Sequence, residues 1–145
     1  MAAGDLTVFN EAKGFLLDGG FEAADVIKVA LVTSATAPTA STASPTLSDF
    51  TEVAAGGNYT AGGASIGDLG TAVTVSGGTA TFDSATNPSW AQNASNPTNA
   101  RYAIIYNDTD ASDRAIAFVD LGSTIDMTVG SLTLTWNPSG LFTVT

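Results

Sequence analysis

The chain has 145 residues, of which 14 are Asp or Glu and 4 are Lys or Arg, so its formal net charge is −10. So few cations cannot neutralise a phosphate backbone or an anionic bilayer surface, which argues against nucleic-acid and membrane partners. The absence of Cys and His removes disulfides, thiolate metal sites and Ser-His-Asp chemistry from consideration.

The first segment, DLTVFNEAKGFLLDGG, predicts one short amphipathic helix that Asp5 or Thr7 caps and the Gly19-Gly20 pair ends. Four residues at helical spacing form an apolar stripe that we expect to pack on the core: Phe9, Ala12, Phe15 and Leu16. The N-terminus, MAAGDLTVFNEAK, has no basic stretch followed by an apolar one, so no secretion signal is expected.

The run VIKVALVTS at residues 26–34 holds a single charge, Lys28, and predicts a strand that is buried on both faces or lies at the centre of a sheet. The next residues, ATAPTASTASPTLS, are rich in Ala, Pro, Ser and Thr, and we interpret residues 35–48 as an extended loop or arm. A brief helical or extended turn is expected over residues 47–53. Long loops usually have a function, and reaching a neighbouring subunit is one candidate.

The segment TAVTVSGGTATFDS predicts a β-hairpin, because alternating residues flank a Gly77-Gly78 turn. The alternation places two valines on one face of the first strand and two apolar residues on the matching face of the second: Val73 and Val75, then Ala80 and Phe82. The following segment, ATNPSWAQNASNPTN, is rich in turn residues, with Trp90 as a large anchor.

Two further strand pairs are expected towards the C-terminus. YAIIY at residues 102–106 pairs across the turn NDTDASD with AIAFVDL at residues 115–121, and SLTLTWN and LFTVT form a last hairpin around residues 138–140. Short strands joined by tight turns predict a mainly β fold: an antiparallel β-sandwich or barrel-like sheet with one short N-terminal α-helix and a long polar loop. Residues 1–145 are expected to form a single domain.

The segment GGNYTAGG at residues 56–63 has the glycines of a phosphate-binding loop but not its reactive groups. Gly63 stands where a P-loop has lysine, and Ala64 stands where it has a hydroxyl residue. The residues that follow read as extended rather than helical. We therefore interpret the segment as a backbone bend that uses positive φ angles.

The turn NDTDASD gathers oxygen ligands at Asn107, Asp108, Asp110 and Asp113, a pattern that could hold Ca²⁺ and stiffen the turn. The turn glycine and the closing glutamate of an EF-hand are missing, so a polar turn in which Asp and Asn bond their own backbone is the simpler interpretation. No pair of carboxylates is singled out for acid–base work. We expect no catalytic residues, no cofactor and no enzymatic activity.

Five motifs follow one another along the chain: VFNEAKGFLLDG, KVALVTS, EVAAGGNYTAGGASI, RYAIIYND and SLTLTWNPSGLF. In this order they resemble a family of small tailed-phage virion proteins, with a VFN helix, a KVALVTS strand, a GYTAGG turn, a RYAVIYDD strand and a closing LTWN-G hairpin. The motifs are structural, and they cover most of the chain. The chain departs from the pattern at residues 35–45 and at Asn58, which interrupts the glycines.

The resemblance implies a capsid cement or decoration protein. Such a protein is made in the host cytoplasm and sits on the outer surface of the phage head, often as a trimer. It clamps the major capsid protein and contacts other copies of itself. Residues 1–7 and 35–45 are the segments expected to make contacts, and the residues selected for partner binding are Leu6, Thr7, Pro38, Thr39, Pro45 and Tyr59.

An alternative is a tail or head-fibre module that binds a host receptor or glycan. This role requires exposed aromatic side chains in a groove, for which Tyr59, Trp90 and Tyr106 are the candidates. A hydrolase of host polymers is disfavoured, because no nucleophile–base pair is evident in the sequence.

Overall fold

In a computed structural model of the protein, which describes residues 6–83 and 86–144, the chain is mainly β and its sheets are antiparallel. The elements in chain order are β1 (Leu6–Val8), α1 (Asn10–Leu17), β2 (Val26–Val32), the 3-10 helix η1 (Leu47–Asp49), β3 (Ala64–Asp68), α2 (Leu69–Ala72), β4 (Val73–Ser76), β5 (Thr79–Phe82), β6 (Ser89–Trp90), β7 (Ala100–Asn107), β8 (Ala115–Ile125), β9 (Leu132–Thr133) and β10 (Phe142–Val144).

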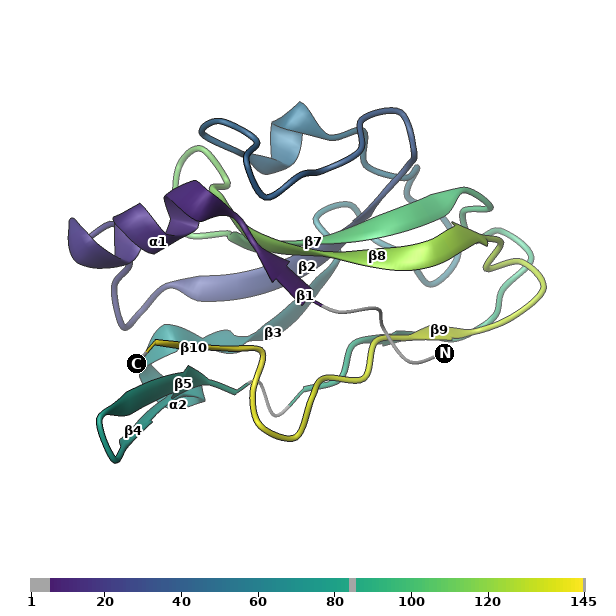
Figure 1. The fold of residues 1–145 in the computed structure, drawn as a ribbon. Coiled ribbons are helices and arrows are strands. Elements are labelled where there is room, and N and C mark those ends of the chain that lie inside the picture. Colours follow the sequence, from purple (N-terminus) through teal and green to yellow (C-terminus); the bar gives the residue numbers. More distant parts are fainter. Residues whose placement is uncertain (1–5, 84–85, 145) are drawn as a thin grey trace.

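The strands form two layers (Figure 1). The five-stranded central sheet has the order β1-β8-β7-β2-β3. Beneath it in Figure 1 lie a three-stranded sheet in the order β10-β5-β4, called here the small sheet, and the β6-β9 pair. The arrangement is sandwich-like. The expected mainly β, antiparallel fold with few helices is therefore confirmed.

Strand β2 lies in the interior of the central sheet, between β7 and β3. Its residues from Val29 to Val32 have no exposed surface, because both faces of the strand are covered. Continuous apolar sequence is typical of strands buried on both faces. The side-chain ammonium group of Lys28 forms an ion pair with the carboxylate of Asp108 at 2.8 Å. The prediction of a strand buried on both faces at this position is confirmed.

The N-terminus of helix α1 differs from the predicted one. Its N-cap is Phe9, which has no exposed surface, and no side chain of the described residues forms a capping hydrogen bond there. Thr7 lies in β1 instead, opposite Phe118 of β8, and Asp5 lies outside the described residues. The ring of Phe9 packs on Phe118 with centroids 5.2 Å apart, so burial of this ring fixes where the helix begins.

The rest of α1 agrees with the predicted stripe and stop signal. Ala12 is buried and Phe15 is half-buried. The side chain of Leu16 lies outside the described residues. After the helix, Gly19 adopts φ 79° and the N–H of Gly20 donates to the carbonyl oxygen of Phe15 at 2.9 Å. A left-handed glycine of this kind satisfies the last carbonyl groups of a helix.

The predicted hairpin at β4 and β5 is confirmed, with Val73 opposite Phe82 and Val75 opposite Ala80. The pairing of β7 with β8 is confirmed as well. The predicted C-terminal hairpin is wrong: β9 pairs with β6, and β10 pairs with β5. The reason lies at Trp136, whose backbone N–H donates to Asn87 and whose indole N–H donates to the carbonyl oxygen of Thr86. These bonds hold the chain against residues 86–90 rather than against its own C-terminus.

Candidate interaction surface

The N-terminal residues selected for partner binding form an edge strand. Leu6 pairs with Val119 and Thr7 with Phe118, so β1 is the outermost strand on one side of the central sheet. Both side chains are half-buried. The described part of the N-terminal segment is thus a component of the sheet rather than a free arm, and residues 1–5 lie outside the described residues.

Of the two forms predicted for residues 35–48, an extended loop or an arm, the structure has a loop, and it is folded onto the body of the protein rather than reaching outwards as an arm. Pro38 and Pro45 are buried, and only Thr39 of the three selected loop residues is exposed. The carbonyl oxygen of Ala40 accepts the N–H of Asn10 at 2.8 Å, which anchors the loop to α1. Farther along, Pro45 accepts the N–H of Ala115 at 2.8 Å, and Glu11 accepts the N–H of Ser44 at 2.7 Å.

Tyr59 is an interior residue with 1% of its surface exposed, so the prediction that it contacts a partner is wrong. Its hydroxyl group donates to Glu52 at 2.6 Å and accepts the backbone N–H of Leu31 at 2.9 Å. Burial, followed by the hydrogen bond to Glu52, raises the pKa of Tyr59 far above its usual value. The ring packs against that of Trp90, with the two centroids 5.9 Å apart.

The other two aromatic residues proposed for glycan binding are buried too. Trp90 and Tyr106 have 4% and 1% of their surface exposed. Burial, together with the nearby carboxylate of Asp108, raises the pKa of Tyr106 above its usual value. None of the three rings of that hypothesis is available to a sugar at the surface.

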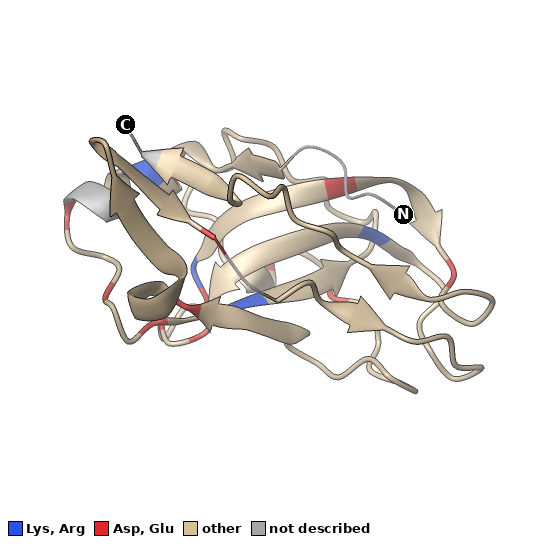
Figure 2. Ribbon diagram, turned by 90° about the horizontal axis from the view of Figure 1, so that it is seen from below, with Lys and Arg blue, Asp and Glu red and all other residues tan. Residues whose placement is uncertain are grey.

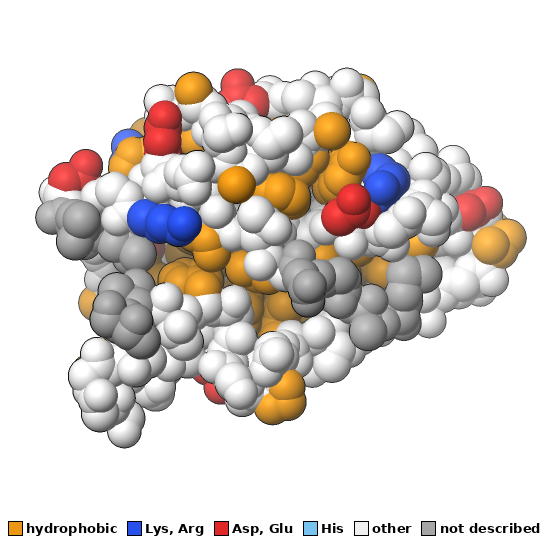
Figure 3. Space-filling model, in the orientation of Figure 1, with side chains coloured by type: hydrophobic (Ala, Val, Ile, Leu, Met, Phe, Trp, Pro, Cys, Tyr) orange, Lys and Arg blue, Asp and Glu red, His pale blue; other side chains and the backbone are white. Residues whose placement is uncertain are grey.

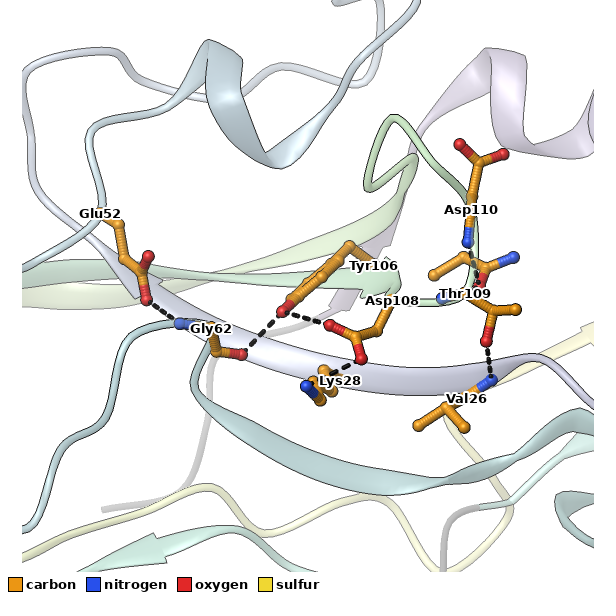
Figure 4. A network of polar contacts seen from close by, with 9 residues as sticks. Val26, Lys28, Glu52, Gly62, Tyr106, Asp108, Thr109 and Asp110 are labelled. Atoms are coloured by element: carbon orange, nitrogen blue, oxygen red, sulfur yellow. Dashed lines mark hydrogen bonds and ion pairs between the residues drawn. The ribbon is translucent and has the colours of Figure 1, made fainter.

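The glycine segment at residues 56–63 binds the carboxylate of Glu52 through two of its residues, Tyr59 and Gly62. The N–H of Gly62 donates to Glu52 at 2.7 Å, and the hydroxyl of Tyr106 donates to the carbonyl oxygen of Gly62 at 2.8 Å (Figure 4). At Gly63, where φ is 69°, a Cβ atom would collide with the carbonyl oxygen of Val29. The amides of the segment bind protein groups, and the glycines permit close backbone packing. These contacts agree with the interpretation as a structural bend.

The acidic turn is organised by its own backbone, as predicted. The side-chain oxygen of Asn107 accepts the N–H groups of Thr109 and Asp110, and its amide donates to Asp25 at 2.7 Å. Lys28 and Arg114 neutralise part of the remaining charge through Asp108 and Asp110 (Figure 4 shows the Lys28 pair). Among the described residues, no group of three or more carboxylates is placed to hold a metal ion.

A cleft of about 250 Å³ opens between α1, the adjoining strands of the central sheet and the small sheet. Its walls are apolar and include Val8, Ala12, Phe21, Leu69, Ala80 and Phe142. Among the described residues that line it, Glu22 is the only ionisable one. Figure 3 shows hydrophobic side chains gathered in this hollow, between α1 above and the small sheet below. An apolar recess of this kind suits an apolar anchor from a partner.

The small sheet beside the cleft carries no ionisable residue in any of its three strands. Figure 2, viewed from below, shows these strands without blue or red. Its outer strand, β4, is exposed along its whole length, and Val75 has 74% of its surface exposed. In a chain of net charge −10, an uncharged, partly apolar sheet stands out as an interaction surface.

The chain matches no protein-family model, no curated protein and no solved structure. No helix within residues 6–83 and 86–144 has the length and hydrophobicity needed to cross a bilayer. The cleft and the small sheet are therefore the features from which a function has to be inferred.

Sequence reasoning identified the hairpin of the small sheet but not its exposure. The available signal was the run LGTAVTVSGGTATF at residues 69–82, which contains no charged residue. A solvent-facing hairpin in an acidic protein would normally carry charges on its outer strand. The cleft had no such signal, because its lining comes from segments spread over the chain from Val8 to Phe142.

Proposed function

We propose that this protein is a virion structural component, a cement or decoration protein that binds the outer surface of a phage head and stabilises its shell. Its partners are the major capsid protein and other copies of itself. The observation that carries the proposal is the open apolar cleft beside an uncharged sheet, which offers hydrophobic contact area on an otherwise acidic molecule.

The positions of the family-like motifs support this proposal. KVALVTS supplies the buried strand β2, RYAIIYND supplies β7, and the glycine segment forms the bend around Glu52. Each motif makes core or backbone contacts. A family defined by such motifs shares a scaffold rather than a reaction, which is what a particle component requires.

The polar groups with shifted pKa values also favour contact over catalysis. Hydrogen bonds from Thr71 lower the pKa of Asp68, and hydrogen bonds from Thr128 lower the pKa of Asp126. Asp120 forms an ion pair with Arg101, which lowers the pKa of its carboxyl group. Asp68 and Asp126 stabilise local turns, and Asp120 lies within β8, opposite Tyr102 of β7.

The cleft suits one or two apolar side chains of a capsid loop. Val8, Leu69 and Phe142 approach it from three different elements, so an inserted side chain would contact apolar surface on several sides. Because a shell presents many identical sites, modest contacts at each site add to a large total through multivalency. The alternative receptor- or glycan-binding function loses its support in the burial of Tyr59, Trp90 and Tyr106.

Co-sedimentation with purified phage heads that lack the protein tests the proposal. Ala23→Asp places a carboxylate at the exposed rim of the cleft, and we expect binding to weaken by about tenfold or more because the charge would be desolvated without a partner. Val129→Asp is the matched control: Val129 is 81% exposed and belongs to the loop between β8 and β9, at the opposite end of the molecule from the β4–β5 hairpin (Figure 1). Equal binding by both variants, or no binding by the unmodified protein, would contradict the proposal.

A further inference from the structure

The outer edge of β4 presents backbone groups with which a further strand can pair. β4 is the outer strand of the small sheet, and within residues 6–83 and 86–144 its only strand partner is β5. The two-residue turn at Gly77 and Gly78 makes Ser76 and Thr79 a hydrogen-bonded pair. Because bonded and non-bonded pairs alternate, the N–H and C=O of Val75 and the C=O of Val73 point to the open side.

Contacts at the base of the hairpin agree with this alternation. The N–H of Asp83 donates to the carbonyl oxygen of Ala72 at 2.8 Å, so Ala72 faces β5, as Thr74 and Ser76 do. The N–H of Val73 donates back to Leu69 in α2. The open edge of β4 therefore presents the carbonyl oxygen of Val73 and both backbone groups of Val75.

Exposed edge strands are normally guarded by charged side chains, proline or bulges. β4 has none of these: its sequence is VTVS, and its pairing with β5 is regular. Among the described residues β1, β3 and β10 are also outer strands of the two larger sheets, and β1 and β10 have only three residues each. The comparable edge, β3 with five residues, pairs with β2 through a register shift and contains Gly67 at φ 129°. β4 is thus the less protected of these two edges.

Charge favours a second copy of this chain as the partner. Two molecules of net charge −10 repel each other over most of their surfaces. Repulsion is weakest where their small sheets meet, because residues 69–82 contain no charged residue. A basic partner would need acidic side chains on this strand for electrostatic attraction, but β4 contains only valine, threonine and serine.

We infer that β4 pairs antiparallel with β4 of a second copy, so that two three-stranded small sheets join into one six-stranded sheet. Directly opposite residues of an antiparallel pair point to the same face. A two-fold axis between Thr74 and Val75 breaks this condition, because it sets Val73 against Ser76. An axis at Val75 satisfies it but sets Val73 against Gly77 of the turn, where φ is 58°. An axis at Thr74 satisfies it within the strand and sets Val73 of each copy opposite Val75 of the other.

In this register the open backbone groups match. The N–H of Val75 donates to the carbonyl oxygen of Val73 in the other copy, and the symmetric bond forms in return. The valines cover one another on one face, and the two Thr74 side chains meet on the other face as a cross-strand pair. The contact is smaller than the about 1,600 Å² of a standard interface, so we expect a dissociation constant on the order of micromolar. The pairing closes after two copies, and it does not depend on the proposed function.

Two cysteine variants test the register in a chain that has no cysteine of its own. The Thr74 pair is non-hydrogen-bonded, with Cα atoms about 4.5 Å apart, which falls within the range of a disulfide. We expect Thr74→Cys to form a covalent dimer under mild oxidation. Ser76→Cys is the matched control, since Ser76 is equally on the exposed strand but lies opposite Ala72 of the other copy. It should remain monomeric.

Sedimentation velocity over a range of concentrations tests the association without cross-linking. The unmodified chain of 14.5 kDa should shift towards twice that mass, and Val75→Lys should abolish the shift while leaving the thermal transition unchanged. A monomer at all concentrations up to about 0.5 mM, well above a micromolar dissociation constant, would overturn the inference. Equal cross-linking of Thr74→Cys and Ser76→Cys would overturn it as well.

Discussion

The hydroxyl of Tyr59 donates a hydrogen bond of 2.6 Å to the carboxylate of Glu52, and this bond connects the glycine segment to the residue that precedes it by seven positions in the sequence. The same hydroxyl accepts the N–H of Leu31, a residue with no exposed surface. One side chain therefore satisfies a buried backbone group of β2 and fixes a carboxylate that also binds Gly62.

Tyr59→Phe should lower the free energy of unfolding by about 1–3 kcal/mol, because the buried N–H of Leu31 loses its partner. Urea denaturation measures the change. Tyr102→Phe, in a half-buried tyrosine whose ring contacts Arg101, is the control and should change stability by less than about 0.5 kcal/mol. A similar loss in both variants would mean that the Tyr59 hydroxyl has no special role.

Asp113 should make the protein less stable as pH rises. The pKa of Asp113 is raised above its usual value, first by burial. The negative charges of Asp108, Asp110 and Glu52 raise this pKa further, and the positive charge of Lys28 lowers it in part. The folded state therefore binds the proton more tightly, and the associated stability is lost as pH rises through the folded pKa. We expect Asp113→Asn to be more stable than the unmodified chain at neutral pH, with the difference vanishing below about pH 3.5. Asn tolerates the φ of 49° at this position.

Asp126→Asn should show the opposite sign. Hydrogen bonds from the hydroxyl and N–H of Thr128 lower the pKa of Asp126, so its contribution is present above the usual carboxyl pKa and lost as pH falls. The variant should be less stable than the unmodified chain at neutral pH and equal to it in acid. Denaturant midpoints at two pH values decide both predictions, and the same sign for the two variants would contradict them.

Two glycine substitutions should move stability in opposite directions. Gly14 lies within α1, where a Cβ would meet nothing within 4 Å, so Gly14→Ala should stabilise by about 0.5–1 kcal/mol. Gly63→Ala should destabilise by more than the about 1–2 kcal/mol of the left-handed conformation, since its Cβ also collides with Val29. Thermal unfolding measures both. Tolerance of Ala at position 63 would refute the close packing of the bend.

The loop at residues 35–45 should matter for stability, because Pro38 and Pro45 are buried against the body. Replacing residues 35–45 by Gly and Ser at the same length should lower Tm by about 5 °C or more. The same replacement limited to residues 35–37, which are all exposed, should leave Tm nearly unchanged. An unchanged Tm in the longer replacement would restore the idea of a detached arm.

Local patterns predicted the local structure well. The alternation around Gly77 and Gly78 identified the β4–β5 hairpin, and the unbroken apolar run identified β2 as an interior strand. Both signals arise from residues adjacent in the chain. The pairing of β10 with β5 had no such signal, because Phe142 and Phe82, which lie opposite each other, are 60 residues apart in the sequence.

Exposure was the property that sequence predicted least well. Tyr59 and Pro38 sit in polar, turn-rich segments that resemble surface loops, yet both are buried. Val75 sits in a strand pattern that resembles core, yet it is exposed because β4 is an outer strand. Burial depends on what packs over a residue, and those neighbours come from distant parts of the chain. The cleft could not be predicted from the sequence for the same reason.

The most direct test of the proposed function is the copy number of this protein relative to the major capsid protein, measured by quantitative mass spectrometry on purified particles of the phage that encodes it. A cement that occupies repeated sites on the shell should be present at a copy number of the same order as that of the capsid subunit. A few copies per particle, or none, would contradict the account and would place the protein at a vertex, in the tail or outside the particle.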